Sequence, residues 1–294
     1  MNVHPTVNID ETITAIIAPA PPQVLNVKRL ALRLPIERST EPYAGRYFLA
    51  RCGALDSPQN PQARFEQWSI YLRRPLFASS RRLNPLYTDE RGKPTEAIWE
   101  FLLPSLGKKN NQEETGEAWL ATLSEGSPVN LIGPLGSGFS MRSVGGNLLL
   151  LAQNDGRLGA LLPLVDSFLD KGGRVTLLIQ GPAQLRQSLL DQLPIAAEMR
   201  LAQTESDWWQ QAAEVMQWAD QVAATISLER TQRLADIIRE KRFRLLPDFA
   251  QILVQADLAC GVGACLACVV PTASGGLTRA CVHGPVFDLT RLAQ

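Results

Sequence analysis

Residues 147–180 read NLLLLAQNDGRLGALLPLVDSFLDKGGRVTLLIQ, and this stretch decides the class of fold. The apolar run at 148–152 predicts a buried strand, and the amphipathic pattern at 158–170, which ends at a Lys-Gly-Gly turn, predicts a helix. A second apolar run at 175–180 predicts another buried strand. Strand, helix and strand in close succession form a βαβ unit, so we expect a parallel sheet in an α/β domain.

The half of the chain before this unit has a different pattern. Turn-rich segments separate short apolar runs there, and no helical pattern lies between them. Several short strands without intervening helices predict a small antiparallel β-barrel. The expected barrel strands are 30–34, 47–50, 68–72, 97–103 and 129–132, and the helices expected after the βαβ unit are 183–192, 207–219 and 228–242.

Length and charge exclude several classes of protein. The 294 residues fit roughly two domains and a small appendage. Lys plus Arg and Asp plus Glu each number 29, so a net charge of +0 gives no electrostatic reason to bind nucleic acid or an acidic membrane. The longest uncharged stretches, such as 143–154, are shorter than the roughly 18 apolar residues that cross a bilayer. Residues 1–23 lack the basic start of a secretory signal, so we expect a cytoplasmic protein.

The cysteines carry the strongest chemical signal. There are five, and four of them lie in the last 35 residues. Their spacing, C-x4-C-x2-C-x12-C, is that of plant-type [2Fe-2S] ligation. Small and apolar residues between the first three let the backbone curl closely round a cluster, so that amides can point at its sulfides, and a hairpin can bring in the fourth ligand. The predicted metal ligands are Cys260, Cys265, Cys268 and Cys281.

Other uses of these residues remain open. Structural zinc normally takes paired cysteine knuckles, and Cys281 has no second member. Disulfides are unfavourable in a chain without a secretory signal. A Rieske site needs two histidines, and His283 has only His4 as a companion, a scarcity that also nearly excludes a Ser-His-Asp triad. We interpret Cys52 as an ordinary buried core residue.

Five short stretches together match the pattern of a known family. They are GRYF at 45–48, LRRPL at 72–76, GPLGSGF at 133–139, ACGVGACLAC at 259–268 and CVHGPVF at 281–287. They resemble the electron-transfer subunit of type B dihydroorotate dehydrogenase, an iron-sulfur flavoprotein within the ferredoxin-NADP reductase superfamily. The resemblance runs from residue 24 to the end of the chain.

The resemblance implies three units and a partner. These are an FAD-binding β-barrel at 24–140, an NAD-binding-like α/β domain at 141–245 and a [2Fe-2S] module at 246–294. Residues 1–23 precede the resemblance, and their composition leads us to expect a loose N-terminal tail. In such proteins FAD exchanges electrons through the cluster with an FMN-containing catalytic subunit that oxidises dihydroorotate in pyrimidine biosynthesis. We therefore expect an oxidoreductase electron-transfer subunit in a hetero-oligomer with that catalytic subunit.

The sequence motifs that bind FAD in this family are only partly present in the chain. The family's Arg-Pro-x-Ser element reads RPLF here, so its hydroxyl is lost. A Gly-Glu pair stands where a Gly-Thr pair approaches the FAD diphosphate, and a carboxylate near two phosphates would weaken binding unless it turns outward. The resemblance still implies FAD binding, because a positive partner and a close backbone survive. The implied FAD-binding residues are Arg74, Pro75, Leu76, Phe77, Gly116 and Glu117.

The motifs that bind the nicotinamide dinucleotide in this family differ more strongly in this sequence. The family's glycine-rich turn reads AQNDGRLGA at 152–160, with the acidic Asp155 where phosphate would approach, and its Cys-Gly-Pro element after a late strand is replaced at 219–221. Both departures predict a degenerate site and poor NADH oxidation. Two alternatives stay open. One is a non-enzymatic iron-sulfur adaptor or redox sensor that has lost NAD and flavin turnover, and the other is an interaction protein stabilised by zinc.

Overall fold

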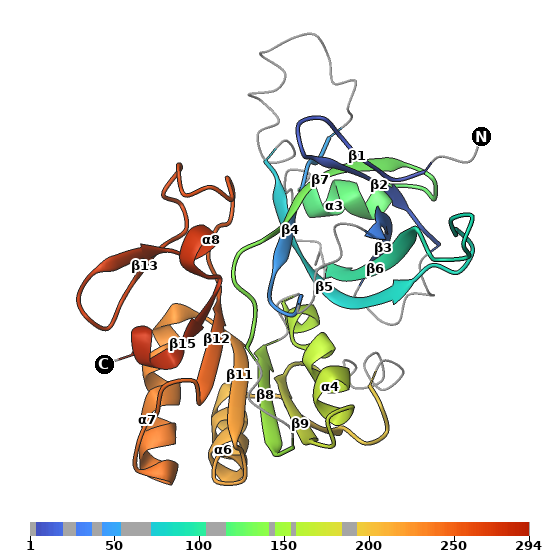
Figure 1. Ribbon diagram of the computed structural model, residues 1–294. Coiled ribbons are helices and arrows are strands. Elements are labelled where there is room, and N and C mark those ends of the chain that lie inside the picture. Colours follow the sequence, from blue (N-terminus) through green and yellow to red (C-terminus); the bar gives the residue numbers. More distant parts are fainter. Residues whose placement is uncertain are drawn as a thin grey trace.

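The computed structural model describes residues 4–19, 28–36, 43–53, 72–103, 116–140, 145–153, 157–183 and 193–293. They form a β-barrel, a sheet with helices, and a C-terminal hairpin that lies beside the sheet (Figure 1). The predicted antiparallel barrel, α/β domain and small C-terminal module are confirmed. Within these described ranges no helix is long and apolar enough to cross a membrane.

Six antiparallel strands close the barrel, because the last strand in sequence, β7, pairs with the first, β2. Side chains alternate along the strands, and the inward-facing Phe48, Trp99 and Phe101 are buried with their rings edge to face. Around the barrel the strands are β2 (Ile13–Ile17), β3 (Lys28–Pro35), β6 (Glu96–Leu103), β5 (Arg74–Leu83), β4 (Tyr47–Ala50) and β7 (Pro128–Leu135).

Most of the barrel follows the apolar runs of the sequence. Four of the five expected strands coincide with β3, β4, β6 and β7, whereas the fifth lies outside the described residues except for Leu72. The apolar runs do not predict β5, whose sequence RPLFASSRRL carries three arginines. Only the four residues 76–79 are buried and the strand ends in the exposed Arg82 and Leu83, so its buried stretch is short.

The N-terminal segment belongs to the barrel, so the expectation of a loose tail over 1–23 is wrong for the residues that the structure describes there. β1 (Thr6–Val7) pairs with β2, and Ile13 and Ala15 of β2 are fully buried. Burial of this apolar strand lets the barrel close. The expectation relied on the lack of basic residues, which says nothing about strand formation.

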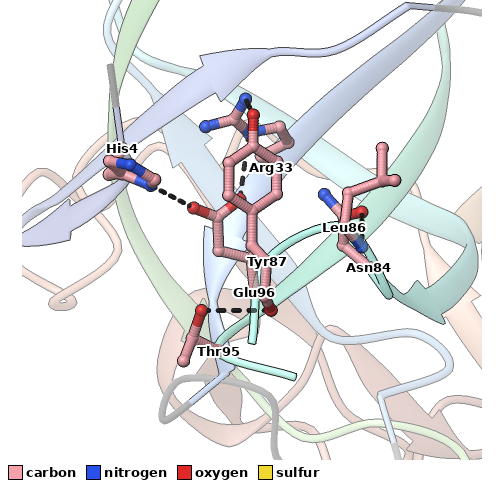
Figure 2. A network of polar contacts seen from close by, with 7 residues as sticks. All are labelled: His4, Arg33, Asn84, Leu86, Tyr87, Thr95 and Glu96. Atoms are coloured by element: carbon pink, nitrogen blue, oxygen red, sulfur yellow. Dashed lines mark hydrogen bonds and ion pairs between the residues drawn. The ribbon is translucent and has the colours of Figure 1, made fainter. Parts of the chain in front are cut away.

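A polar network ties the start of the chain to the rim of the barrel (Figure 2). The carboxylate of Glu96 is almost fully buried and pairs with Nε of Arg33 at 3.0 Å and with Nδ1 of His4 at 2.9 Å. Arg33 also donates to the hydroxyl of Tyr87 at 2.8 Å and lies over its ring. A buried carboxylate needs such partners, so the network holds residue 4 against β3 and β6.

The α/β domain contains the predicted βαβ unit, β8 (Asn147–Gln153), α4 (Leu162–Leu169) and β9 (Arg174–Gln180). The sheet order is β10-β9-β8-β11-β12-β15, parallel except for the last strand. The expected helix at 183–192 lies outside the described residues except for 183. The remaining elements of the domain are β10 (Glu198–Ala202), α6 (Glu205–Val215), β11 (Gln221–Ile226), α7 (Thr231–Arg242) and β12 (Ala250–Val254).

The C-terminal module shares the sheet of the α/β domain. β12 is fully buried between β11 and β15 (Val286–Asp288), so the parallel sheet continues past the expected boundary at residue 245. This happens because AQILV at 250–254 is an apolar run that pairs with β11. The predicted hairpin is present as β13 (Val269–Pro271) and β14 (Leu277–Arg279), followed by the short helix α8 (Ala280–His283).

Candidate functional site

The first three cysteines lie on one loop between β12 and β13, and this loop rests against the barrel. Gly261 and Gly263 adopt φ angles of +72° and +76°, which other residues rarely adopt. A methyl group placed on Gly261 would lie 2.8 Å from Leu135 Cδ1 and 2.9 Å from Leu49 Cδ1. Glycine therefore gives the loop both its curvature and its close approach to β4 and β7.

Backbone amides surround the sulfur atom of Cys260. The amides of Cys265, Val262 and Ala264 donate to it, and with the amide of Cys265 first they lower the pKa of Cys260 to about 6. These amides favour the thiolate, which is the form that binds a metal.

Cys268 and Cys281 are buried and lie side by side. The amide of Cys281 donates to Cys268 Sγ at 3.4 Å. Burial raises the pKa of Cys281, and the neighbouring sulfur of Cys268 raises it further. Two adjacent buried thiols favour the thiolate form only when a bound cation compensates their charge. The pair therefore fits a metal centre by its chemistry.

The structure places the four predicted ligands in two pairs, Cys260 with Cys265 and Cys268 with Cys281, and does not bring the two pairs to one metal position. Cys265 is exposed, so the centre would lie at the surface on one side and against the barrel on the other. Among the residues that the structure describes, no three His, Cys, Asp or Glu side chains converge on one metal position.

The remaining candidates for sulfur or imidazole ligation point elsewhere. Nδ1 of His283 lies 3.0 Å from the hydroxyl of Thr278, on the exposed side of the hairpin. Cys52 is fully buried in the barrel core, as the sequence analysis predicts. Burial raises the pKa of Cys52 to about 12, and the charge of Glu117 adds to this effect. Cys52 is therefore an inert thiol at physiological pH.

The predicted flavin residues from β5 and from α3 (Gly116–Thr122) also lie together. Nε of Arg74 lies 3.2 Å from Oε2 of Glu117, and about a quarter of each side chain is exposed, 22% and 24%. A methyl group on Gly116 would lie 2.8 Å from both Arg74 Cγ and Cys52 Sγ. The close backbone survives, but the carboxylate of Glu117 faces Arg74 and does not turn outward.

The neighbouring arginine has a different environment. Arg73 donates to the carbonyl of Leu49 at 3.0 Å and to Oδ1 of Asn130 at 2.7 Å. These bonds link the residue before β5 to β4 and β7, so Arg73 is part of the barrel framework. The two consecutive arginines therefore face different partners, and Arg74 is the one beside α3.

The other members of the RPLF element divide between two cores. Leu76 belongs to the core inside the barrel, whereas Phe77 belongs to the core shared with the α/β domain, as strand alternation requires. Pro75 pairs in register with Leu49 of β4. The ring of Phe77 lies 6.0 Å, centroid to centroid, from that of Tyr47. Phe77 thus lies on the face of the barrel that meets the α/β domain and carries Tyr47, whereas alternation places Arg74 on the same side of the strand as Leu76.

The turn after β8 departs from a dinucleotide site in its described part. Nε2 of Gln153 donates to Oε1 of Gln180 at 2.9 Å, so this side chain spans the carboxyl ends of β8 and β9. A methyl group on Gly159 would lie 3.3 Å from Ser79 Cβ and 3.4 Å from Leu102 Cγ of the barrel. Gly159 is therefore a packing residue between the domains. Residues 154–156 lie outside the described residues.

The replacement of the Cys-Gly-Pro element is wrongly placed at 219–221. Asp220 lies before β11, where its carboxylate accepts the amide of Asn147 at 2.9 Å, and Gln221 is the first residue of the strand. Ligand sites of parallel sheets lie at the carboxyl ends of the strands. The residues that follow β11 are Ser227 and the turn Leu228–Arg230, which contain neither cysteine, glycine nor proline.

Comparison with known proteins agrees with this geometry. Residues 255–293 match the model of the iron-sulfur cluster binding domain of dihydroorotate dehydrogenase B. The chain is 26% identical over 182 residues to the electron transfer subunit of dihydroorotate dehydrogenase B (NAD(+)) from Geobacillus thermodenitrificans (strain NG80-2), covering 60% of this chain and 69% of that one.

Solved structures share the fold. An NADH-dependent reduced ferredoxin-NADP oxidoreductase, described for flavin-based electron bifurcation, superposes with a TM-score of 0.63 at 17% identity over 95% of this chain and 89% of that chain. The ferredoxin reductase of carbazole 1,9a-dioxygenase in its FAD apo form gives a TM-score of 0.52 at 12% identity over 82% and 66%. The chain therefore has the ferredoxin-NADP reductase fold and resembles the electron transfer subunit of dihydroorotate dehydrogenase B, and its residues 255–293 are similar to the iron-sulfur cluster binding domain of that protein.

Proposed function

We propose that this chain is an oxidoreductase electron-transfer subunit that moves electrons between FAD on the barrel and a [2Fe-2S] cluster in the C-terminal module. The observation that carries the proposal is the cysteine loop. Three amides donate to the Cys260 sulfur, two buried thiols lie side by side, and the loop packs on the barrel through Gly261. Flavins exchange one or two electrons and the cluster exchanges one, so the pair joins two-electron to one-electron chemistry.

The residues of this chain would act mainly by ligation and charge. Cys260, Cys265, Cys268 and Cys281 would supply the thiolates. Arg74 would neutralise the FAD diphosphate, beside the close backbone at Gly116. Leu76 and Pro75 fix the strand on which Arg74 lies, and Phe77 fills the space between the barrel and the α/β domain.

We propose that the partner is an FMN-containing catalytic subunit like that of dihydroorotate dehydrogenase, in a cytoplasmic hetero-oligomer of pyrimidine biosynthesis. The similarity to a chain named as an electron transfer subunit supports a catalytic partner. Exposed apolar side chains around the cysteine loop also support one: Val262 is 72% exposed, Leu266 60% and Val282 43%. Apolar residues beside a redox centre bring a partner within electron-transfer distance when it buries them.

A second candidate function is an iron-sulfur adaptor that binds no flavin. The ion pair between Arg74 and Glu117 favours it, because the carboxylate takes the position of an anionic ligand. An absorption spectrum of the anaerobically purified chain, with iron, sulfide and released-flavin assays, separates the two. We expect two irons and one FAD per chain. A cluster without flavin supports the adaptor, and a colourless chain that contains zinc contradicts both.

A further inference from the structure

Tyr47 is a buried residue that lies between the barrel and the cysteines. Strand alternation on β4 places Phe48 and Ala50 in the barrel core, and Tyr47 and Leu49 in the core shared with the α/β domain and the C-terminal module. The side chain of Tyr47 is 0% exposed. Its aromatic ring therefore points away from the barrel interior and toward the loop that carries the predicted ligands.

The hydroxyl of Tyr47 reaches the fourth cysteine. It donates to the backbone carbonyl of Cys281 at 3.4 Å. A methyl group placed on Gly261 would lie 3.8 Å from the hydroxyl oxygen of Tyr47. The hydroxyl therefore lies between Gly261 and the carbonyl of Cys281. A phenol is protonated at neutral pH, so the hydroxyl acts as the hydrogen-bond donor to this carbonyl.

The ring of Tyr47 is fixed from two other sides. A methyl group placed on Gly136 would lie 2.9 Å from Tyr47 Cε1, so the end of β7 closes over the ring. Phe77 of the predicted flavin element lies 6.0 Å away, centroid to centroid. The ring thus extends from Phe77 to Cys281, and its rotamer has little freedom in this packing.

We propose that Tyr47 is a positioning residue of the iron-sulfur centre, whose O–H holds the Cys281 peptide and raises the reduction potential of the cluster. The inference rests on the proposed function, because it needs a cluster at the four cysteines. Reduction adds a negative charge to the cluster. Donation to the Cys281 carbonyl offsets the negative partial charge of that oxygen in a water-free site, so the peptide of this ligand repels the added charge less.

The test compares two Tyr→Phe variants of the full chain. Tyr47→Phe removes the buried hydroxyl beside Cys281, whereas Tyr87→Phe removes one that accepts from Arg33 on the same barrel, remote from the cysteines. The midpoint potential of the cluster is measured by a redox titration followed by electron paramagnetic resonance. We expect Tyr47→Phe to lower the potential and Tyr87→Phe to leave it unchanged.

Each other outcome has a defined meaning. Equal potentials in wild type and Tyr47→Phe, with equal iron content, overturn the inference. Loss of iron in Tyr47→Phe alone, with unchanged circular dichroism, supports it, because the hydroxyl is then needed to hold the ligand. A Tyr47→Phe chain that is unfolded assigns the residue to core packing and overturns it. Wild type without an iron-sulfur signal contradicts the proposed function and not merely the role of Tyr47.

Discussion

Arg74 and Glu117 form an ion pair at 3.2 Å, in the place where the resemblance puts a cation and a hydroxyl around the FAD diphosphate. The two residues come from β5 and from the first turn of α3, and the absence of a side chain on Gly116 lets them meet. The carboxylate therefore neutralises the cation that would bind phosphate. Any diphosphate that enters must displace Glu117 from Arg74.

Replacement of Glu117 by Gln is predicted to strengthen FAD binding. The amide keeps the size of the side chain but removes the charge that occupies Arg74 and repels phosphate. We expect about a tenfold lower Kd, equal to about 1.4 kcal/mol. Titration of the apoprotein with FAD by fluorescence quenching measures it.

A matched control uses another acidic residue of the barrel. Glu100 pairs with Arg82 at 3.7 Å on the neighbouring strands, so Glu100→Gln removes a similar charge away from α3. Its Kd for FAD should equal that of wild type. A weaker affinity in Glu117→Gln would mean that the carboxylate helps to organise the site.

Replacement of either of the two consecutive arginines by alanine is predicted to have a different effect. Arg74→Ala should weaken FAD binding at least tenfold, because a charge-assisted phosphate bond contributes about 1.5–3 kcal/mol. Arg73→Ala should instead lower the free energy of unfolding by about 1–3 kcal/mol, because it leaves the carbonyl of Leu49 and Oδ1 of Asn130 without their donor. Flavin titration and urea denaturation measure the two effects. Equal FAD affinities in the two variants would contradict the assignment of Arg74.

The cluster ligands are predicted to be individually required. Alanine in place of Cys260, Cys265, Cys268 or Cys281 removes a thiolate that no neighbouring side chain replaces, so the iron and acid-labile sulfide content should fall to near zero. Cys52→Ala should keep both, because Cys52 lies in the barrel core. Retention of two irons in Cys281→Ala would refute the ligand set.

The sequence predicts the features that depend on residues close together in the chain. It does not predict the contacts between segments that are far apart in the chain. The cysteine loop and the βαβ unit depend on neighbours in the chain, so spacing and periodicity predict them. β2 escapes prediction because its stability comes from β3 and β7, and β7 is far away in the sequence. The ion pair of Arg74 with Glu117 and the hydrogen bond of Tyr47 to Cys281 are likewise tertiary contacts, which no motif encodes.

Thiol reactivity of the metal-free chain is predicted to depend on pH in a site-specific way. The amides of the loop lower the pKa of Cys260 to about 6, so its thiolate forms as the pH rises through that value. Alkylation of Cys260 by iodoacetamide should therefore accelerate through about pH 6 and level off above it.

Cys52 serves as the internal reference for that measurement. Burial raises the pKa of Cys52 to about 12, so it should stay unmodified until the protein is unfolded. Mass spectrometry of peptides after timed quenching gives both rates. A Cys260 rate that keeps rising up to about pH 9, as expected for an ordinary thiol, would show that the amides do not stabilise its thiolate in solution.

NADH is predicted to be a poor electron donor to this chain. A dinucleotide needs a turn without side chains after the first strand, and here Gln153 spans β8 and β9 through its bond to Gln180. Asn154 and Asp155 follow where the family has glycines, and the acidic side chain repels the diphosphate.

Hydride transfer needs the reacting atoms within about 3.5 Å, and a misplacement of about 1 Å costs about 100-fold in rate. We therefore expect flavin reduction by NADH below about 0.1 s⁻¹, against a typical turnover of about 10 s⁻¹. Anaerobic stopped-flow mixing measures the bleaching of the flavin band, with dithionite as the control that reduces any bound flavin. Rapid bleaching at micromolar NADH would show that the turn accepts the dinucleotide in spite of these side chains.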